Sequence, residues 1–278
     1  MTEHVPVWSM IFMGVSCVGA FAGPIVLAIW LRKRKGADVW PFPVGCLVMF
    51  IFAFVLEQMA HSVILGSGIG IAGADRTLTR AVYGGVMAGL FEETGRLIAF
   101  LTVLRGYREK DSNALMYGAG HGGLEAFVLL GISMINNLAW SYLFNAGQMD
   151  VLTQNVSGDA AARVQETILQ LCHVPSGLFL LGLFERICAV ALHLALSVFV
   201  WFAVKNRRWI LFGAAILMHA AVDAVTAEMA NLGVPELAIE GILAVMTAAA
   251  CLAARAVWRK EAARAAEVIP AAEEEKDG

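Results

Sequence analysis

The chain has 278 residues, of which 59% are apolar (Ala, Val, Ile, Leu, Met, Phe, Trp, Tyr or Cys). Only 15% are charged, with a formal net charge of −3, whereas an average soluble domain is about 25% charged. This composition excludes a disordered chain, a nucleic-acid-binding protein with a basic face and almost any ordinary soluble enzyme. We therefore expect an all-α, polytopic transmembrane helical bundle.

Apolar runs predict about seven spans, each near the ~20 residues that cross a bilayer. The predicted spans cover residues 7–31, 42–65, 82–104, 114–135, 177–204, 210–229 and 237–258. The first run is too long for the apolar part of a signal peptide, so we expect it to be retained. We expect one transmembrane domain over residues 1–260, with the functional core at about 82–229, and a charged cytoplasmic tail at 261–278.

Two further features of the sequence concern its outer connection and its cysteines. Residues 136–174 are predicted to connect two spans outside the membrane, with an amphipathic interfacial helix over about 160–171. The five cysteines include no CxxC pair, which favours their being small buried hydrophobic residues over ligands.

The basic residues predict the orientation of the bundle. Fifteen of the 20 Lys and Arg residues lie in alternate loops and the C-terminal region, and only three lie on the other side. Positive loops stay in the cytoplasm, so the N-terminus is predicted outside and the C-terminus inside. We expect a multi-pass protein of the cytoplasmic membrane, surrounded by lipid.

Ionisable residues inside the predicted spans are expensive and usually functional. The third span contains Glu92, Glu93 and Arg96 within five residues. Arg96 can pair with either glutamate, because the spacings are i+4 and i+3. A structural ion pair explains one glutamate and leaves the second unexplained.

The next three spans carry further pairs. His121 and Glu125 share a helix face at i,i+4, among glycines that allow close helix packing. His193 lies two turns after an adjacent Glu-Arg pair, which can support it or bind another helix. His219 and Asp223 repeat the i,i+4 spacing. In each case the alternative to a functional role is a histidine that is buried in the core with its hydrogen bonds made.

Glu57 and His61 in the second span have the same spacing, but nothing else in the sequence supports a functional role, so that role stays open. The remaining groups lie on four spans at similar depth. Converging carboxylates and imidazoles indicate a divalent metal, and the ligand types favour zinc. Zinc with three protein ligands and a nearby glutamate base is the chemistry of metal-assisted peptide hydrolysis.

The motif order EExxR, GxGHGGxE, a lone histidine and HxxxD resembles the YhfC group of intramembrane metalloproteases. That group is related to type II CAAX prenyl proteases and bacteriocin-processing proteins, to PrsW proteases and to the Aph subunit of gamma-secretase. The resemblance covers about residues 89–223. Asp223 stands where the CAAX group has Asn, and Arg96 is one residue closer to the glutamates than in that group.

The resemblance implies an intramembrane peptidase with Glu92 as the general base, positioned by Glu93 and Arg96. It implies Glu125, His193 and His219 as zinc ligands. His121 competes with Glu125 as a ligand or acts as an oxyanion donor, and Asp223 supports the site. The resemblance thus assigns three groups of residues: Glu92, Glu93 and Arg96 to catalysis, Glu125, His193, His219 and His121 to the metal, and Asp223 to the support of the site.

The expected substrate is a membrane-associated peptide or protein, with no nucleic acid involved. Two other functions stay open. A proton- or metal-coupled transporter also uses intramembrane Glu and His chains, although the sequence shows no inverted repeat. A non-catalytic scaffold subunit is the other alternative, because the Aph subunit keeps some of the same residues without known protease activity of its own.

Overall fold

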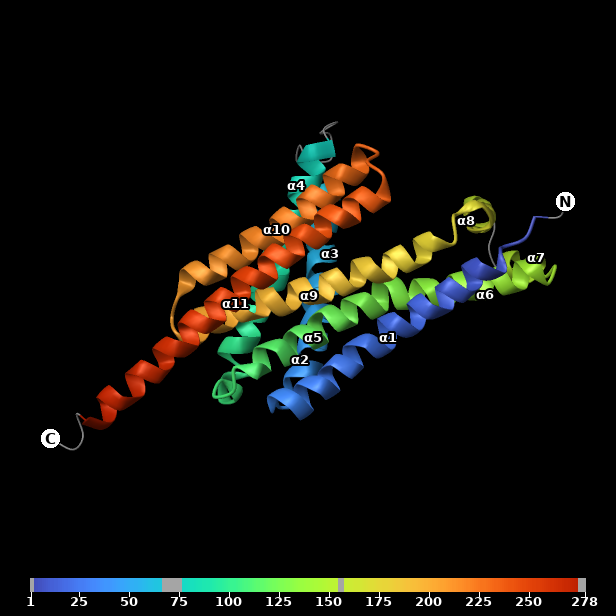
Figure 1. Cartoon of the computed structure of the whole chain (residues 1–278). Coiled ribbons are helices and arrows are strands. Elements are labelled where there is room, and N and C mark those ends of the chain that lie inside the picture. The colour runs from blue at the N-terminus through green and yellow to red at the C-terminus, as the bar shows by residue number, and fades with distance from the viewer. Residues whose placement is uncertain (1–2, 67–76, 155–157, 275–278) are drawn as a thin grey trace.

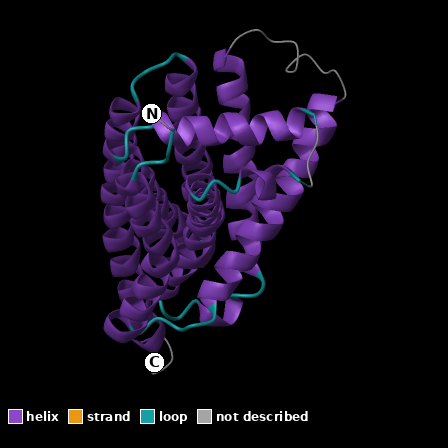
Figure 2. Ribbon diagram, turned by 90° about the vertical axis from the view of Figure 1, so that its right-hand side faces the viewer, coloured by secondary structure: helices purple, strands orange, loops and turns teal. Residues whose placement is uncertain are grey.

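The computed structural model describes residues 3–66, 77–154 and 158–274, and all regular secondary structure within these ranges is helical. Figures 1 and 2 show a bundle of long helices, with the two ends of the chain at opposite ends of the molecule. The α-helices are α1 (Val7–Lys35), α2 (Pro41–Met49), α3 (Gln58–Gly66), α4 (Thr77–Leu101), α5 (Ser112–Ala126), α6 (Ser133–Asn145), α7 (Met149–Thr153), α8 (Asp159–His173), α9 (Gly177–Lys205), α10 (Trp209–Asn231) and α11 (Glu236–Glu274). The all-α prediction is confirmed.

Six helical runs are long and apolar enough to cross a membrane, and they match six of the seven predicted spans. These runs are Val7–Lys35, Pro41–Gly66, Ser112–Asn145, Gly177–Lys205, Trp209–Asn231 and Glu236–Glu261. The predicted span at 82–104 falls mostly within α4, a 25-residue helix that contains buried Glu92, Glu93 and Arg96. Because of those charged groups, α4 is not among the six apolar runs. The count of seven spans and the orientation of the bundle in the membrane stay predictions.

The fourth span is longer than predicted. Helix α5 passes through a π-helical segment, Phe127–Ile132, directly into α6, which ends at Asn145. The apolar run is interrupted by Asn136 and Asn137, but the helix continues past them. The prediction that residue 136 begins a connection is therefore wrong. The amphipathic helix predicted over 160–171 is confirmed as α8, which is seen nearly end-on in Figure 1.

Glycines bring the helices that carry the candidate residues into close contact. A Cβ atom on Gly122 would lie 2.9 Å from Cδ2 of His193, and one on Gly120 would lie 2.0 Å from the carbonyl oxygen of Phe42. Gly118 and Gly123 are equally close to α9 and α1. The predicted role of the α5 glycines is confirmed: they let α5 pack directly on α1, α2 and α9.

Helix α9 lies at the centre of the main hydrophobic core. Its second half is buried continuously from Ala195 to Val204. Phe100 of α4 makes edge-to-face contacts with Trp201 of α9 (5.1 Å between ring centroids) and Tyr117 of α5 (4.7 Å). This packing fixes α4, α5 and α9 against one another one to two turns from the candidate site.

Candidate metal centre

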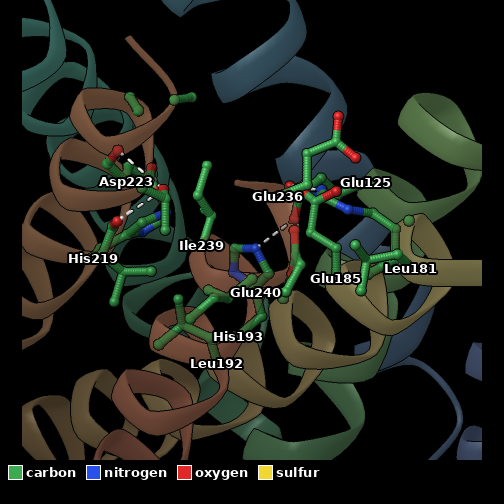
Figure 3. A pocket seen from close by; sticks show the side chains of 18 of the residues that line it. Glu125, Leu181, Glu185, Leu192, His193, His219, Asp223, Glu236, Ile239 and Glu240 are labelled. Atoms are coloured by element: carbon green, nitrogen blue, oxygen red, sulfur yellow. Dashed lines mark hydrogen bonds and ion pairs between the residues drawn. The ribbon is translucent and has the colours of Figure 1, made fainter. Parts of the chain in front are cut away.

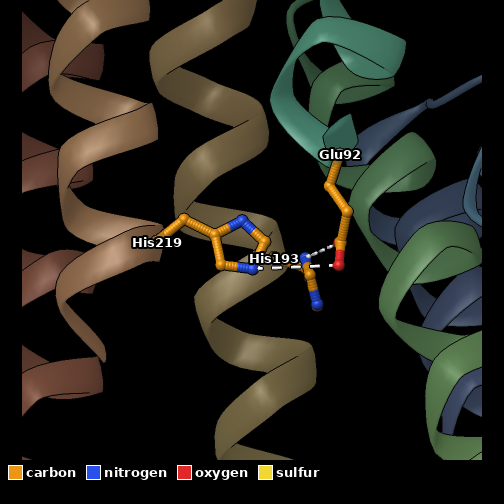
Figure 4. A group of neighbouring side chains, drawn as sticks. All are labelled: Glu92, His193 and His219. Atoms are coloured by element: carbon orange, nitrogen blue, oxygen red, sulfur yellow. Dashed lines mark ion pairs between the residues drawn. The ribbon is translucent and has the colours of Figure 1, made fainter. Parts of the chain in front are cut away.

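Three buried side chains from three helices converge in the interior of the bundle. Glu92 comes from α4, His193 from α9 and His219 from α10, and Figure 4 shows them pointing toward one another. One ligand atom from each lies within 4.8 Å of the other two. Glu92 Oε2 is 4.0 Å from His193 Nδ1, and Glu92 Oε1 is 4.0 Å from His219 Nε2.

Each imidazole is held on its far side by a carboxylate. His193 Nε2 donates to Glu125 Oε2 (2.7 Å), and His219 Nδ1 donates to Glu93 Oε1 (2.9 Å). A carboxylate only accepts, so these bonds set the tautomers and leave the lone pairs of His193 Nδ1 and His219 Nε2 toward Glu92. A carboxylate behind the imidazole is the usual support of a metal-binding histidine.

The second ring nitrogen of His219 faces two acceptors. Its Nε2 lies 3.5 Å from Asp223 Oδ2 and 4.0 Å from Glu92 Oε1, while Nδ1 is already bonded to Glu93. A lone pair that faces two carboxylates is unfavourable unless a proton or a metal ion lies among them. This arrangement fits a cation, and two imidazoles with one carboxylate form a set that catalytic zinc takes.

Arg96 pairs with Glu93, one of the two partners that its position allowed. Its Nη1 donates to both carboxylate oxygens of Glu93 (2.8 and 2.6 Å), and both side chains are fully buried. Its Nη2 donates to His193 Nδ1 (3.1 Å). A metal ion bound at His193 Nδ1 therefore has to replace this last hydrogen bond.

His121 contacts Glu92 and lies outside the group of three. His121 Nε2 donates to Glu92 Oε2 (2.9 Å), and the hydroxyl of Tyr117 lies 3.4 Å from His121 Nδ1. The ring of His121 is completely buried, so it holds Glu92 in place. Tyr117 was not among the residues predicted from the sequence, although its position one turn before His121 is the signal that could have identified it.

Glu125 is bonded at both oxygens. Its Oε2 accepts from His193, and its Oε1 accepts from Arg186 Nη1 (2.7 Å). The second nitrogen of Arg186 pairs with neighbouring Glu185. The Glu-Arg pair of α9 therefore both supports His193 and binds another helix, because it acts through Glu125 of α5. The sequence had left these two roles open as alternatives.

Glu57 and His61 form a separate group. His61 Nε2 is 3.2 Å from Glu57 Oε1, and His61 Nδ1 is 2.9 Å from the hydroxyl of Tyr83. Both ring nitrogens of His61 are thus engaged within the second span and α4, and neither residue belongs to the group of three.

A cavity of about 560 Å³ leads to the three side chains. Figure 3 shows His219 and Asp223 on one side of it and Glu125 and Glu185 on the other. Glu236 and Glu240 at the start of α11 also line it. The site is accessible to a ligand larger than a metal ion.

The chain matches the YhfC intramembrane metalloprotease family over residues 19–247. It is also 35% identical over 243 residues to a protein of Bacillus subtilis (strain 168) named as the uncharacterized membrane protein YhfC, which covers 86% of this chain and 93% of that protein. No solved structure matches the chain. With most of its length matched in both comparisons, the chain belongs to the YhfC intramembrane metalloprotease family.

Proposed function

We propose that the protein is a metal-dependent endopeptidase that hydrolyses a peptide bond at or within the cytoplasmic membrane. The observation that carries this proposal is the buried group of Glu92, His193 and His219, whose ligand atoms lie within 4.8 Å of one another. The cavity above them and the family of the chain support it.

In this proposal Glu92, His193 and His219 hold zinc. Glu125 and Glu93 hold the two imidazoles from behind, through the bonds of 2.7 and 2.9 Å. This exchanges two roles that the resemblance implied: Glu92 becomes a ligand instead of the base, and Glu125 a positioning residue instead of a ligand. Zinc, when bound, supplies Lewis-acid polarisation of the scissile carbonyl and activation of a water.

Asp223 is the carboxylate best placed to move the proton. Glu125 is paired with Arg186 and Glu92 is bonded to His121. Among the described residues, the carboxylate of Asp223 has one polar neighbour, His219 Nε2 at 3.5 Å. The side chain of Asp223 is 39% exposed and lines the cavity. It can therefore accept a proton from the attacking water at Oδ2 and return it to the leaving amine.

The test is mass-spectrometric detection of new N-termini in a detergent extract of bacterial membrane proteins, after incubation with the purified protein reconstituted in liposomes. The wild type is expected to generate new N-termini that a zinc chelator abolishes. Asp223→Asn is expected to keep its zinc and lose about 10²–10⁴-fold in rate. If the wild type generates no metal-dependent N-termini, the peptidase proposal is wrong and a scaffold or transport function gains support.

Glu92→Gln separates the two roles of Glu92. A ligand role predicts loss of zinc together with loss of cleavage, because the amide is a poorer ligand than the carboxylate. A variant that retains zinc at the wild-type stoichiometry but does not cleave would return Glu92 to the role of general base.

A further inference from the structure

A groove between α9 and α11 ends in two arginines, Arg255 and Arg259, which we call the groove arginines. It has a volume of about 430 Å³, and none of the residues that line it lines the cavity of the metal centre. The rest of its lining is largely apolar and consists of Leu115, Leu194, Ala195, Val198, Cys251, Ala254 and Trp258.

The groove lies where the apolar spans end. The spans of α1 and α9 end at Lys35 and Lys205, that of α5 begins at Ser112, and that of α11 ends at Glu261. The groove arginines precede the end of the α11 span by six and two residues, and both are exposed. Their long side chains can therefore reach the headgroup layer while their stems stay among acyl chains.

Two neighbouring lysines at this end of the bundle already have partners. Lys110 Nζ lies 2.6 Å from Asp38 Oδ1, and Lys205 Nζ lies 2.5 Å from Asp111 Oδ1. Hydrogen bonds from Lys110 and Asn113 hold the pKa of the Asp38 carboxyl below its usual range. Within the described part of the chain, the groove arginines make no ion pair or hydrogen bond, so their charge is available to a ligand.

Trp258 stands between the apolar wall and the charged end. Its ring packs edge-to-face on Phe202 of α9, at 5.7 Å between centroids and 85° between planes. Trp258 also lines an adjoining cavity with Lys35 and Lys110. A tryptophan fixed at the end of a span is typical of the boundary between acyl chains and headgroups.

We propose that this groove binds an anionic phospholipid. One acyl chain lies along the apolar wall formed by α9 and α11, and the phosphate pairs with the groove arginines beside Trp258. An apolar slot with two cations at its mouth complements a lipid that is apolar over its length and anionic at one end. A zwitterionic lipid would bring its own cation to the arginines and pair with them less well.

The experiment is native mass spectrometry of the full chain, delipidated in detergent, during titration with phosphatidylglycerol or with phosphatidylcholine of the same acyl chains. The wild type is expected to bind phosphatidylglycerol more tightly. In Arg255→Gln/Arg259→Gln the affinity for phosphatidylglycerol is expected to fall about 30-fold, the effect of two lost cationic contacts. Arg255→Lys/Arg259→Lys should keep most of the preference.

The matched control is Arg34→Gln/Arg105→Gln, which removes two exposed arginines that do not line the groove. An equal loss in the control would show diffuse charge attraction and overturn the proposal. Equal affinities of the wild type for the two lipids would overturn it as well. Displacement of phosphatidylglycerol by glycerol phosphate at similar concentration would assign the site to the free phosphate group instead.

Discussion

His193 Nε2 donates a hydrogen bond of 2.7 Å to Glu125 Oε2, joining α9 to α5 across 68 positions of sequence. The other oxygen of Glu125 accepts from Arg186 at 2.7 Å. A carboxylate held at both oxygens is well placed to fix the direction of the imidazole. The lone pair of His193 Nδ1 consequently faces Glu92, on the side where the proposed metal ion would bind.

Glu125→Gln should weaken metal binding without unfolding the protein. The amide keeps the shape of the side chain but offers one acceptor, so it cannot serve both His193 and Arg186. We expect the dissociation constant for zinc to rise about 10- to 100-fold, measured by competition with a chromophoric chelator. Glu236→Gln, which changes another cavity carboxylate, should leave the affinity unchanged. Unchanged affinity in Glu125→Gln would rule out this positioning role.

The buried pair of Glu93 and Arg96 should show strong coupling in stability. Both side chains are completely buried, so Glu93→Gln or Arg96→Met alone leaves one uncompensated charge and should cost about 3–5 kcal/mol. The double variant should lose less than the sum of the two single variants. Thermal unfolding of the metal-free protein in detergent measures this double-mutant cycle, and simple additivity would show that the pair is not coupled.

Gly120→Ala should destabilise the contact between α5 and α2. The new Cβ would lie 2.0 Å from the carbonyl oxygen of Phe42, and a backbone atom cannot move aside as a side-chain end can. We expect a loss of about 1–3 kcal/mol or more, seen as a lower unfolding temperature. Gly14→Ala is the matched control, because its Cβ would meet nothing within 4 Å, so it should be neutral or slightly stabilising.

Much of the fold follows from the sequence because apolar runs of span length have few stable alternatives in a membrane. One feature did not follow. Asn136 and Asn137 interrupt the apolar run, yet the helix continues to Asn145, because backbone hydrogen bonding does not depend on side-chain polarity. The helix α4 was predicted despite its charged residues, which are tolerated in a span only where other helices bury and pair them.

The residues that meet in the candidate site could be named from the sequence, but their pairing could not. Spacing shows that His121 and Glu125 share a helix face, and it allowed Arg96 to pair with Glu92 or Glu93. Which carboxylate meets which imidazole depends on how each helix is rotated and how closely it approaches its neighbour. Contacts between helices, such as that between Gly122 and His193, set that rotation. The spacing of residues within one helix cannot predict such contacts.

The most direct test of the metal centre is the zinc content of the purified protein in detergent. The wild type is compared with His193→Ala/His219→Ala and with His61→Ala, which removes a histidine outside the group of three. We expect about one zinc per chain in the wild type and in His61→Ala, the content of a mononuclear site, and almost none in the double variant. Equal zinc in all three proteins, or a folded wild type that binds none, would contradict the account.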